Sequence, residues 1–188
     1  MSDAPTPAAA AAPVGGPTTG LIYADVPNRA IAYIIDAIVL FVVNIIVSVI
    51  LAAIGLIPAT INADLTVSVN YVASLIYAAI SLAISAAYFI YFWTTSRATI
   101  GMRALSLQIG KAPGGETITQ DQAIRRWLAL SAPFILAQVL QPLPLLGFIV
   151  GIAALGWVIY LIYTTAQSPT KQGWHDVFAG TMVVKAVK

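Results

Sequence analysis

Four long apolar runs constrain this chain more than any other feature of its sequence. They cover roughly residues 30–57, 71–95, 126–141 and 145–166, and each contains few or no charged side chains. An α-helix needs about 20 apolar residues to cross a bilayer, and backbone groups in lipid have to hydrogen-bond within their own segment. The runs therefore predict four transmembrane helices. A content of 60% hydrophobic and 9% charged residues agrees with a membrane protein.

The distribution of basic residues predicts how these helices are oriented. The connection 58–70 contains no Lys or Arg. The connection 96–125 and the tail 167–188 are both basic, with Arg97, Arg103, Lys111, Arg125, Lys171, Lys185 and Lys188. By the positive-inside rule, both termini should lie on the cytoplasmic side.

Strand-like residues in the basic connection predict a small cytoplasmic cap. Leu105, Leu107 and Ile109 alternate with polar or small residues and are followed by Pro-Gly-Gly, which is typical of a short hairpin. The segment "GTMVVKAV" at 180–187 also has strand character and can join it. The expected fold is an all-α membrane protein of four transmembrane helices with a small β-hairpin-containing cap, and with the N and C termini inside.

The first 27 residues differ in composition from the rest of the chain. They are dominated by Ala, Pro, Gly and Thr and contain no Lys or Arg, so they lack the basic start of a signal peptide. This composition predicts a disordered cytoplasmic tail over 1–27. The membrane domain is then expected over 28–188.

Several function classes have no support in the sequence. The chain has no cysteine and one histidine, so a disulfide, a thiolate nucleophile and a multi-His metal site within one chain are excluded. A net charge of +2 with scattered basic residues does not indicate nucleic-acid binding. Phosphate-loop and catalytic-triad motifs are absent from the sequence. We therefore expect no enzyme activity, no cofactor and no metal site.

Arg29 and Asp36 stand near the start of the first apolar run. Seven helical residues turn through about 700°, so the two side chains share a face about 10 Å apart along the axis. An ionised Asp36 facing lipid would cost ~2–3 kcal/mol, so it should face protein or water. Three environments would relieve it, namely a reach-back from Arg29, a base from another segment such as Arg103 or Arg126, or protonation.

Three segments carry a recognisable pattern, "NRAIAYIID" at 28–36, "TIGMRALSLQI" at 99–109 and "GWHDVFAGTMVV" at 173–184. Together they resemble the RDD family of small bacterial membrane proteins, over about residues 26–185. The family is named for an arginine and two aspartates, which correspond to Arg29, Asp36 and Asp176. The surrounding pattern is matched by Gly101, Arg103, His175, Gly180 and Thr181. The resemblance implies a multi-pass protein of the bacterial cytoplasmic (inner) membrane.

Some members of that family have been proposed as sodium/proton antiporters, which favours ion or proton-coupled cation transport here. In this hypothesis Asp36 alternates between a proton and a monovalent cation, Arg29 adjusts its affinity for the proton, and Asp176 completes a buried Arg/Asp cluster. The supporting residues are His175, Arg103 and Asn44. Four helices make a thin wall around a pathway, so we expect a homo-oligomer in the lipid bilayer.

The alternative is a non-transporting scaffold or partner-binding protein, in which the Arg/Asp cluster is structural. Two other polar features are open to both interpretations. Asn44 can form an interhelical hydrogen bond or extend a path outward. The second apolar run carries a polar stripe that can line a water path or make a close helix contact, formed by Ser74, Tyr77, Ser81, Ser85 and Tyr88.

Overall fold

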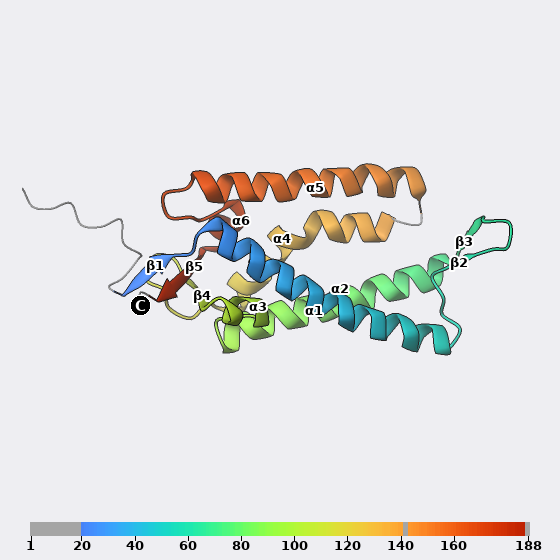
Figure 1. Cartoon of the computed structure of the whole chain (residues 1–188), viewed down its shortest axis with the longest axis horizontal. Helices are drawn as coiled ribbons and strands as arrows, with labels where there is room; N and C mark the ends of the chain where they lie inside the picture. The colour runs from blue at the N-terminus through green and yellow to red at the C-terminus, as the bar shows by residue number, and fades with distance from the viewer. Residues whose placement is uncertain (1–19, 141–142, 187–188) are drawn as a thin grey trace, which may run out of the picture.

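The computed structural model describes residues 20–140 and 143–186 of the chain. Four long helices run along the length of the molecule, and a small sheet lies at one end of them, next to the C-terminus (Figure 1). The helices are α1 Val26–Ala53, α2 Tyr71–Thr95, α3 Ile100–Ala104, α4 Gln120–Leu140, α5 Pro144–Gln167 and α6 Trp174–Ala179.

The four long helices are long and apolar enough to cross a membrane, which confirms the predicted transmembrane segments. Helix α2 has the predicted bounds of 71–95. Helix α1 begins at Val26 rather than at residue 30, because Pro27 has the fixed φ that suits a first helical turn. It ends at Ala53 rather than at 57, because Gly55 adopts a φ of 80° that no longer continues the helix.

Helix α4 begins at Gln120, about 1.7 turns before the predicted start at 126. Thr119 caps this start, because its Oγ1 accepts a hydrogen bond from the backbone N of Gln122 at 3.2 Å. The predicted end at 141 lies outside the described residues. Helix α5 differs from the predicted 145–166 by one residue at each end.

The sheet contains three antiparallel strands in the order β1-β5-β4, namely β1 Leu21–Tyr23, β5 Thr181–Ala186 and β4 Leu107–Lys111. Strand β1 lies inside the segment 1–27 that was predicted to be disordered, so that prediction is wrong for its last residues. The physical reason is backbone pairing, since β1 hydrogen-bonds to the edge of β5 whatever its side chains are. Residues 1–19 lie outside the described part of the chain.

The strand predicted around Leu107 and Ile109 is present as β4, but its partner is β5 and not the residues that follow it. The hairpin that the structure forms is β2 Ala59–Ile61 with β3 Val67–Val69. It lies in the connection 58–70, at the end of the molecule opposite the sheet (Figure 1).

We call the assembly of β1, β4, β5, α3 and α6 the cap. The main hydrophobic core lies where the cap meets the helices, and joins Leu107, Ile109 and Val183 of the sheet to Phe89 and Trp93 of α2. Farther from the cap, α1 and α5 expose large apolar side chains along their flanks, as expected for surfaces that contact lipid. The core therefore fixes the cap to the helix ends, which is where the polar residues gather.

Candidate functional site

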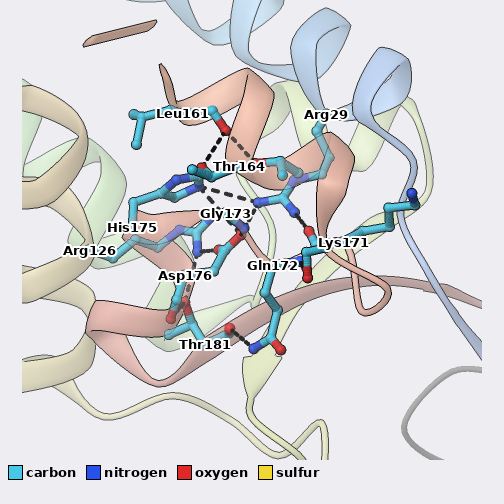
Figure 2. A network of polar contacts seen from close by, with 12 residues as sticks. Arg29, Arg126, Leu161, Thr164, Lys171, Gln172, Gly173, His175, Asp176 and Thr181 are labelled. Atoms are coloured by element: carbon cyan, nitrogen blue, oxygen red, sulfur yellow. Dashed lines mark hydrogen bonds and ion pairs between the residues drawn. The ribbon is translucent and has the colours of Figure 1, made fainter. Parts of the chain in front are cut away.

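Asp176 is the centre of an ionic cluster between the cap and two long helices. Its side chain is fully buried in the first turn of α6. Arg29 of α1 donates to Oδ2 and Arg126 of α4 donates to Oδ1, and both form ion pairs with the carboxylate (Figure 2). One carboxylate therefore ties three helices together.

The other contacts of the two arginines complete this cluster. Arg29 also donates to the backbone carbonyl of Lys171 (Figure 2), and Arg126 donates to Thr181 Oγ1 at 2.7 Å. The backbone N of Gly173 donates to Asp176 Oδ2 at 3.1 Å. We call Arg29, Arg126, His175, Asp176 and Thr181 the Asp176 cluster.

His175 takes part in this cluster as a neutral ring. Burial, and then the positive charges of Arg126 and Arg29, lower the pKa of His175 well below its usual value. Its Nε2 lies 3.5 Å from Asp176 Oδ2, but a neutral ring does not form an ion pair. Nε2 also lies 3.3 Å from an Nη of Arg29, which is always a donor. Nε2 therefore lies between a donor on Arg29 and the carboxylate of Asp176.

Asp36 is also buried, but its partners are neutral. Its carboxylate accepts hydrogen bonds from Tyr88 Oη at 2.6 Å, from Thr99 Oγ1 at 2.5 Å and from the backbone N of Gly101 at 2.8 Å. Thr99 is the N-cap of α3, and its Oγ1 also accepts from the backbone N of Met102. Asp36 therefore holds the start of α3 against α1 and α2.

Gly101 makes this arrangement possible. A Cβ at this position would lie 2.0 Å from the backbone oxygen of Ala32 in α1 and 3.1 Å from Cγ of Asp36. Real Cβ atoms do not approach a carbonyl oxygen so closely, so any larger residue would push α3 away from α1. The close approach of two backbones explains why glycine is needed in the segment "TIGMRALSLQI".

The structure separates the residues that the sequence grouped together. Among the described residues, no ion pair joins Asp36 to an arginine. Of the three environments considered for Asp36, the reach-back from Arg29 and the base from Arg103 or Arg126 are therefore not present. Arg29 and Arg126 turn to Asp176 because α6 brings that carboxylate between them. The single predicted Arg/Asp cluster is two sites.

Two supporting residues lie outside both sites. Arg103 is exposed, and its guanidinium lies 5.4 Å from the ring centroid of Phe92. Asn44 accepts a hydrogen bond from Ser81 Oγ at 2.5 Å and donates to the backbone oxygen of Leu40, so it links α1 to α2. This is the interhelical bond that one interpretation of Asn44 predicted.

Three site residues were missed or misplaced by sequence reasoning. Arg126 is the one charged residue in the predicted range 126–141. A single charge in an apolar run indicates that the side chain is paired with a buried opposite charge. Tyr88 was placed on the polar stripe of the second run but without a partner, and Thr99 had no comparable signal, because a threonine before a short helix is an ordinary residue.

Two cavities lie along the helices, and the first of them touches both sites. Cavity 1, of about 330 Å³, lies between α1, α4 and α5, and the polar side chains that line it include Arg29, Asp36, Arg126 and His175. Cavity 2, of about 360 Å³, is farther from the cap, and its polar lining includes Asn44, Tyr77, Ser81, Ser85 and Gln138. Tyr33 and Phe134 line both cavities, so these two side chains form a shared wall.

The four apolar helices, with two carboxylates buried at one end, define a multi-pass membrane protein. Comparison with protein families then identifies it more closely. A sequence profile of the RDD family matches residues 23–180, and the chain belongs to this family. Comparisons with curated proteins and with solved structures give no match. The resemblance noted from Arg29, Asp36 and Asp176 is confirmed.

Proposed function

We propose that this RDD protein exchanges a monovalent cation for a proton across the bacterial cytoplasmic membrane, with Asp36 as the carboxylate that binds either one. The observation that carries the proposal is the partnering of Asp36. It is buried, it lines cavity 1, and its hydrogen-bond donors are all neutral.

A buried carboxylate without a fixed positive partner attracts a mobile one. Removing an ion from water costs several kcal/mol unless another charge compensates it. Asp176 receives that compensation from two arginines, whereas three neutral donors compensate Asp36 only in part. A proton or a cation that reaches Asp36 through cavity 1 completes the compensation, and the two compete for one site.

The oxygen atoms around Asp36 suit a hard cation. Thr99 Oγ1 and Tyr88 Oη each lie within hydrogen-bonding distance of the carboxylate. A hydroxyl has two lone pairs as well as its proton, so it can rotate from donating to Asp36 to accepting a cation. Carboxylate and hydroxyl oxygens are ligands that hard cations prefer.

Cavity 2 supports a route away from Asp36. Its hydroxyl and amide groups can hold water or a partly hydrated ion, and it shares the wall of Tyr33 and Phe134 with cavity 1. A movement of these two side chains would connect Asp36 to the far end of the helices. In this scheme the basic cap faces the cytoplasm, and neighbouring copies in a homo-oligomer cover the exposed flanks of the helices.

Arg29 and Asp176 have a different role in this proposal from the one that the sequence suggested. They hold α1 against α4 and α6, and so fix the cap side of cavity 1. Neither has to release its partner during exchange. In this proposal the proton and the cation exchange only at Asp36.

A scaffold function remains the second candidate, and the hydrogen bonds of Asp36 favour it. Asp36 accepts one hydrogen bond each from Tyr88 of α2, Thr99 and Gly101. This pattern is typical of a carboxylate that holds one helix against its neighbours. In that case Asp36 never exchanges its partners, and the exposed cap or the helix flanks bind another protein.

Flux through proteoliposomes separates the two candidates. Native protein and the Asp36→Asn variant are reconstituted, and sodium, potassium and proton movements are followed under imposed gradients. Asp64→Asn is the matched control, because Asp64 is exposed in the turn between β2 and β3. We expect flux from the native protein and the control, and none from a folded Asp36→Asn protein. A folded native protein that moves none of these ions would favour the scaffold.

A further inference from the structure

Helix α6 has two opposite faces of different character. His175 and Asp176 are buried and belong to the Asp176 cluster. Trp174, Val177 and Phe178 lie on the other face, at the i, i+3 and i+4 spacing, with exposed fractions of 39%, 65% and 51%. We call these three side chains the α6 patch. Adjacent large apolar side chains that are exposed together mark a surface that contacts a protein or a membrane.

The α6 patch continues the exposed flank of α5. The ring of Trp174 packs against Trp157 of α5 with centroids 5.2 Å apart, and against Phe178 with centroids 5.1 Å apart. Trp157 in turn packs against Tyr160, which is exposed on α5. An unbroken row of aromatic rings therefore joins the patch to a flank that is expected to face lipid.

The chain turns back after α5, so α6 lies beside that helix and not beyond its end (Figure 1). The backbone N of Trp174 donates to Thr164 Oγ1 at 3.2 Å. Thr164 and Trp157 lie three and ten residues before Gln167, the last residue of α5. At 1.5 Å per residue, these positions are about 4.5 Å and about 15 Å from the helix end.

These positions can be compared with the thickness of a bilayer. A helix of 24 residues is about 36 Å long, and the hydrocarbon core is about 30 Å thick. With α5 centred in the bilayer, the core therefore begins about 3 Å inside each helix end. Both contacts of Trp174 on α5 then lie at the edge of the hydrocarbon or within it.

We propose that α6 is an interfacial helix, whose patch is inserted into the acyl chains just below the head groups on the cap side of the bilayer. Lipid is the occupant that fits this depth, because a water-soluble partner does not reach below the head groups. Tryptophan suits this boundary, since its ring is apolar and its indole N–H is polar. The bilayer then holds α6 against the helices that Asp176 joins. The proposal does not depend on transport, because it concerns the surface of α6 and not Asp36.

Spin-label accessibility of the full chain in lipid vesicles measures the depth of this patch. The chain has no cysteine, so Val177→Cys carries one nitroxide label per chain. Ile159→Cys is the control in lipid, because Ile159 is 68% exposed on α5. Asp64→Cys is the control in water, because Asp64 is exposed in the turn between β2 and β3. Collisions with oxygen, which dissolves in hydrocarbon, are compared with collisions with a water-soluble nickel chelate.

We expect the oxygen-to-nickel collision ratio at Val177 to be close to that at Ile159 and well above that at Asp64. A ratio equal to that at Asp64 would place the α6 patch in water and overturn the proposal. A label that neither reagent reaches would be covered by protein, which would also overturn it, and broadening by a neighbouring label would identify that protein as a second copy. Phe178→Cys repeats the measurement on the same patch if Val177→Cys does not fold.

Brominated lipids give a second measure of the depth of Trp174. Bromine atoms are placed near the head-group end or near the methyl end of the acyl chains, and Trp174→Phe keeps an aromatic ring while removing one of the four tryptophans. We expect bromine near the head groups to quench a larger fraction of the fluorescence in the native protein than in Trp174→Phe. Equal quenching of the two proteins by both lipids would overturn the proposal.

Discussion

Asp36 and Asp176 are both almost completely buried, with exposed fractions of 2% and 0%, yet they lie in opposite electrostatic surroundings. Asp176 is held between the guanidinium groups of Arg29 and Arg126. Asp36 is held by two hydroxyls and one backbone N–H, and in the described part of the chain it forms no ion pair with an arginine. The two sites share α1 and the cap, to which the Asp176 site adds α4 and the Asp36 site adds α2.

This difference in partners indicates which carboxylate can exchange the group that it binds. Releasing Asp176 would leave two buried guanidinium groups without a counter-charge, so its charge is fixed. Asp36 has no counter-charge to lose, and its hydroxyl partners can reorient. This chain therefore has one aspartate that holds helices together and a second that lines a cavity.

The largest effect should come from Asp176→Asn. It leaves two buried arginines uncompensated, and we expect a loss of about 3–5 kcal/mol in the free energy of unfolding. Thermal unfolding in detergent, followed by the fluorescence of the four tryptophans, measures it. Asp121→Asn is the control, because that exposed aspartate forms only a surface pair with Arg125 and should change stability by less than about 0.5 kcal/mol. Equal melting of the two variants would show that the Asp176 cluster is not the structural site.

Gly101→Ala should be the next most damaging change, and it acts on the other aspartate. The new Cβ would meet the backbone oxygen of Ala32, so α3 has to move and the hydrogen bond to Asp36 is lost. We expect a loss of about 3 kcal/mol, the upper range for overpacking. Gly114→Ala is the control, since its Cβ would meet nothing closer than 3.6 Å. If both variants have the same melting temperature, α3 is not held against α1 as described.

Thr99→Val tests how much one hydroxyl contributes to the stability of the Asp36 site. Valine keeps the shape but removes the donor to Asp36 and the cap of Met102, and we expect a loss of about 2 kcal/mol. Thr99→Ser retains the hydroxyl and should retain most of the stability. A chemical-denaturation series in detergent distinguishes them. Similar losses in both variants would mean that the methyl group, and not the hydroxyl, stabilises the site.

The pH dependence of stability reports on the Asp176 cluster, with the smallest effect. Burial and two arginines keep the pKa of His175 well below its usual value, so the folded protein does not take up the proton that the unfolded chain binds below about pH 6.5. Stability should then fall as the pH falls, by up to about 1.4 kcal/mol between pH 6.5 and pH 5.5.

Melting temperatures between pH 7.5 and pH 5 test this slope. The chain has one histidine, so His175→Gln should flatten the slope in that interval. Identical slopes in the two proteins would contradict a neutral, buried His175.

The membrane-spanning helices could be predicted from the sequence because apolar length is a local property of the chain. The pairing of β1 with β5 could not, since its backbone hydrogen bonds join residues such as Leu21 and Ala186 from the two ends of the described chain. The partners of Asp36 were hidden for the same reason, because Gly101 lies 65 residues farther along. Spacing within one helix placed Arg29 and Asp36 on one face, but the partner that the fold brings to Arg29 is Asp176.

Proton release on cation binding tests the exchange at Asp36 most directly. Sodium or potassium is added to the detergent-solubilised protein in weakly buffered solution, and the released protons are counted for each chain. We expect proton release from the native protein and from Asp64→Asn, and no proton release from a folded Asp36→Asn variant. Equal release from Asp36→Asn, or no release from the folded native protein with either cation, would contradict it.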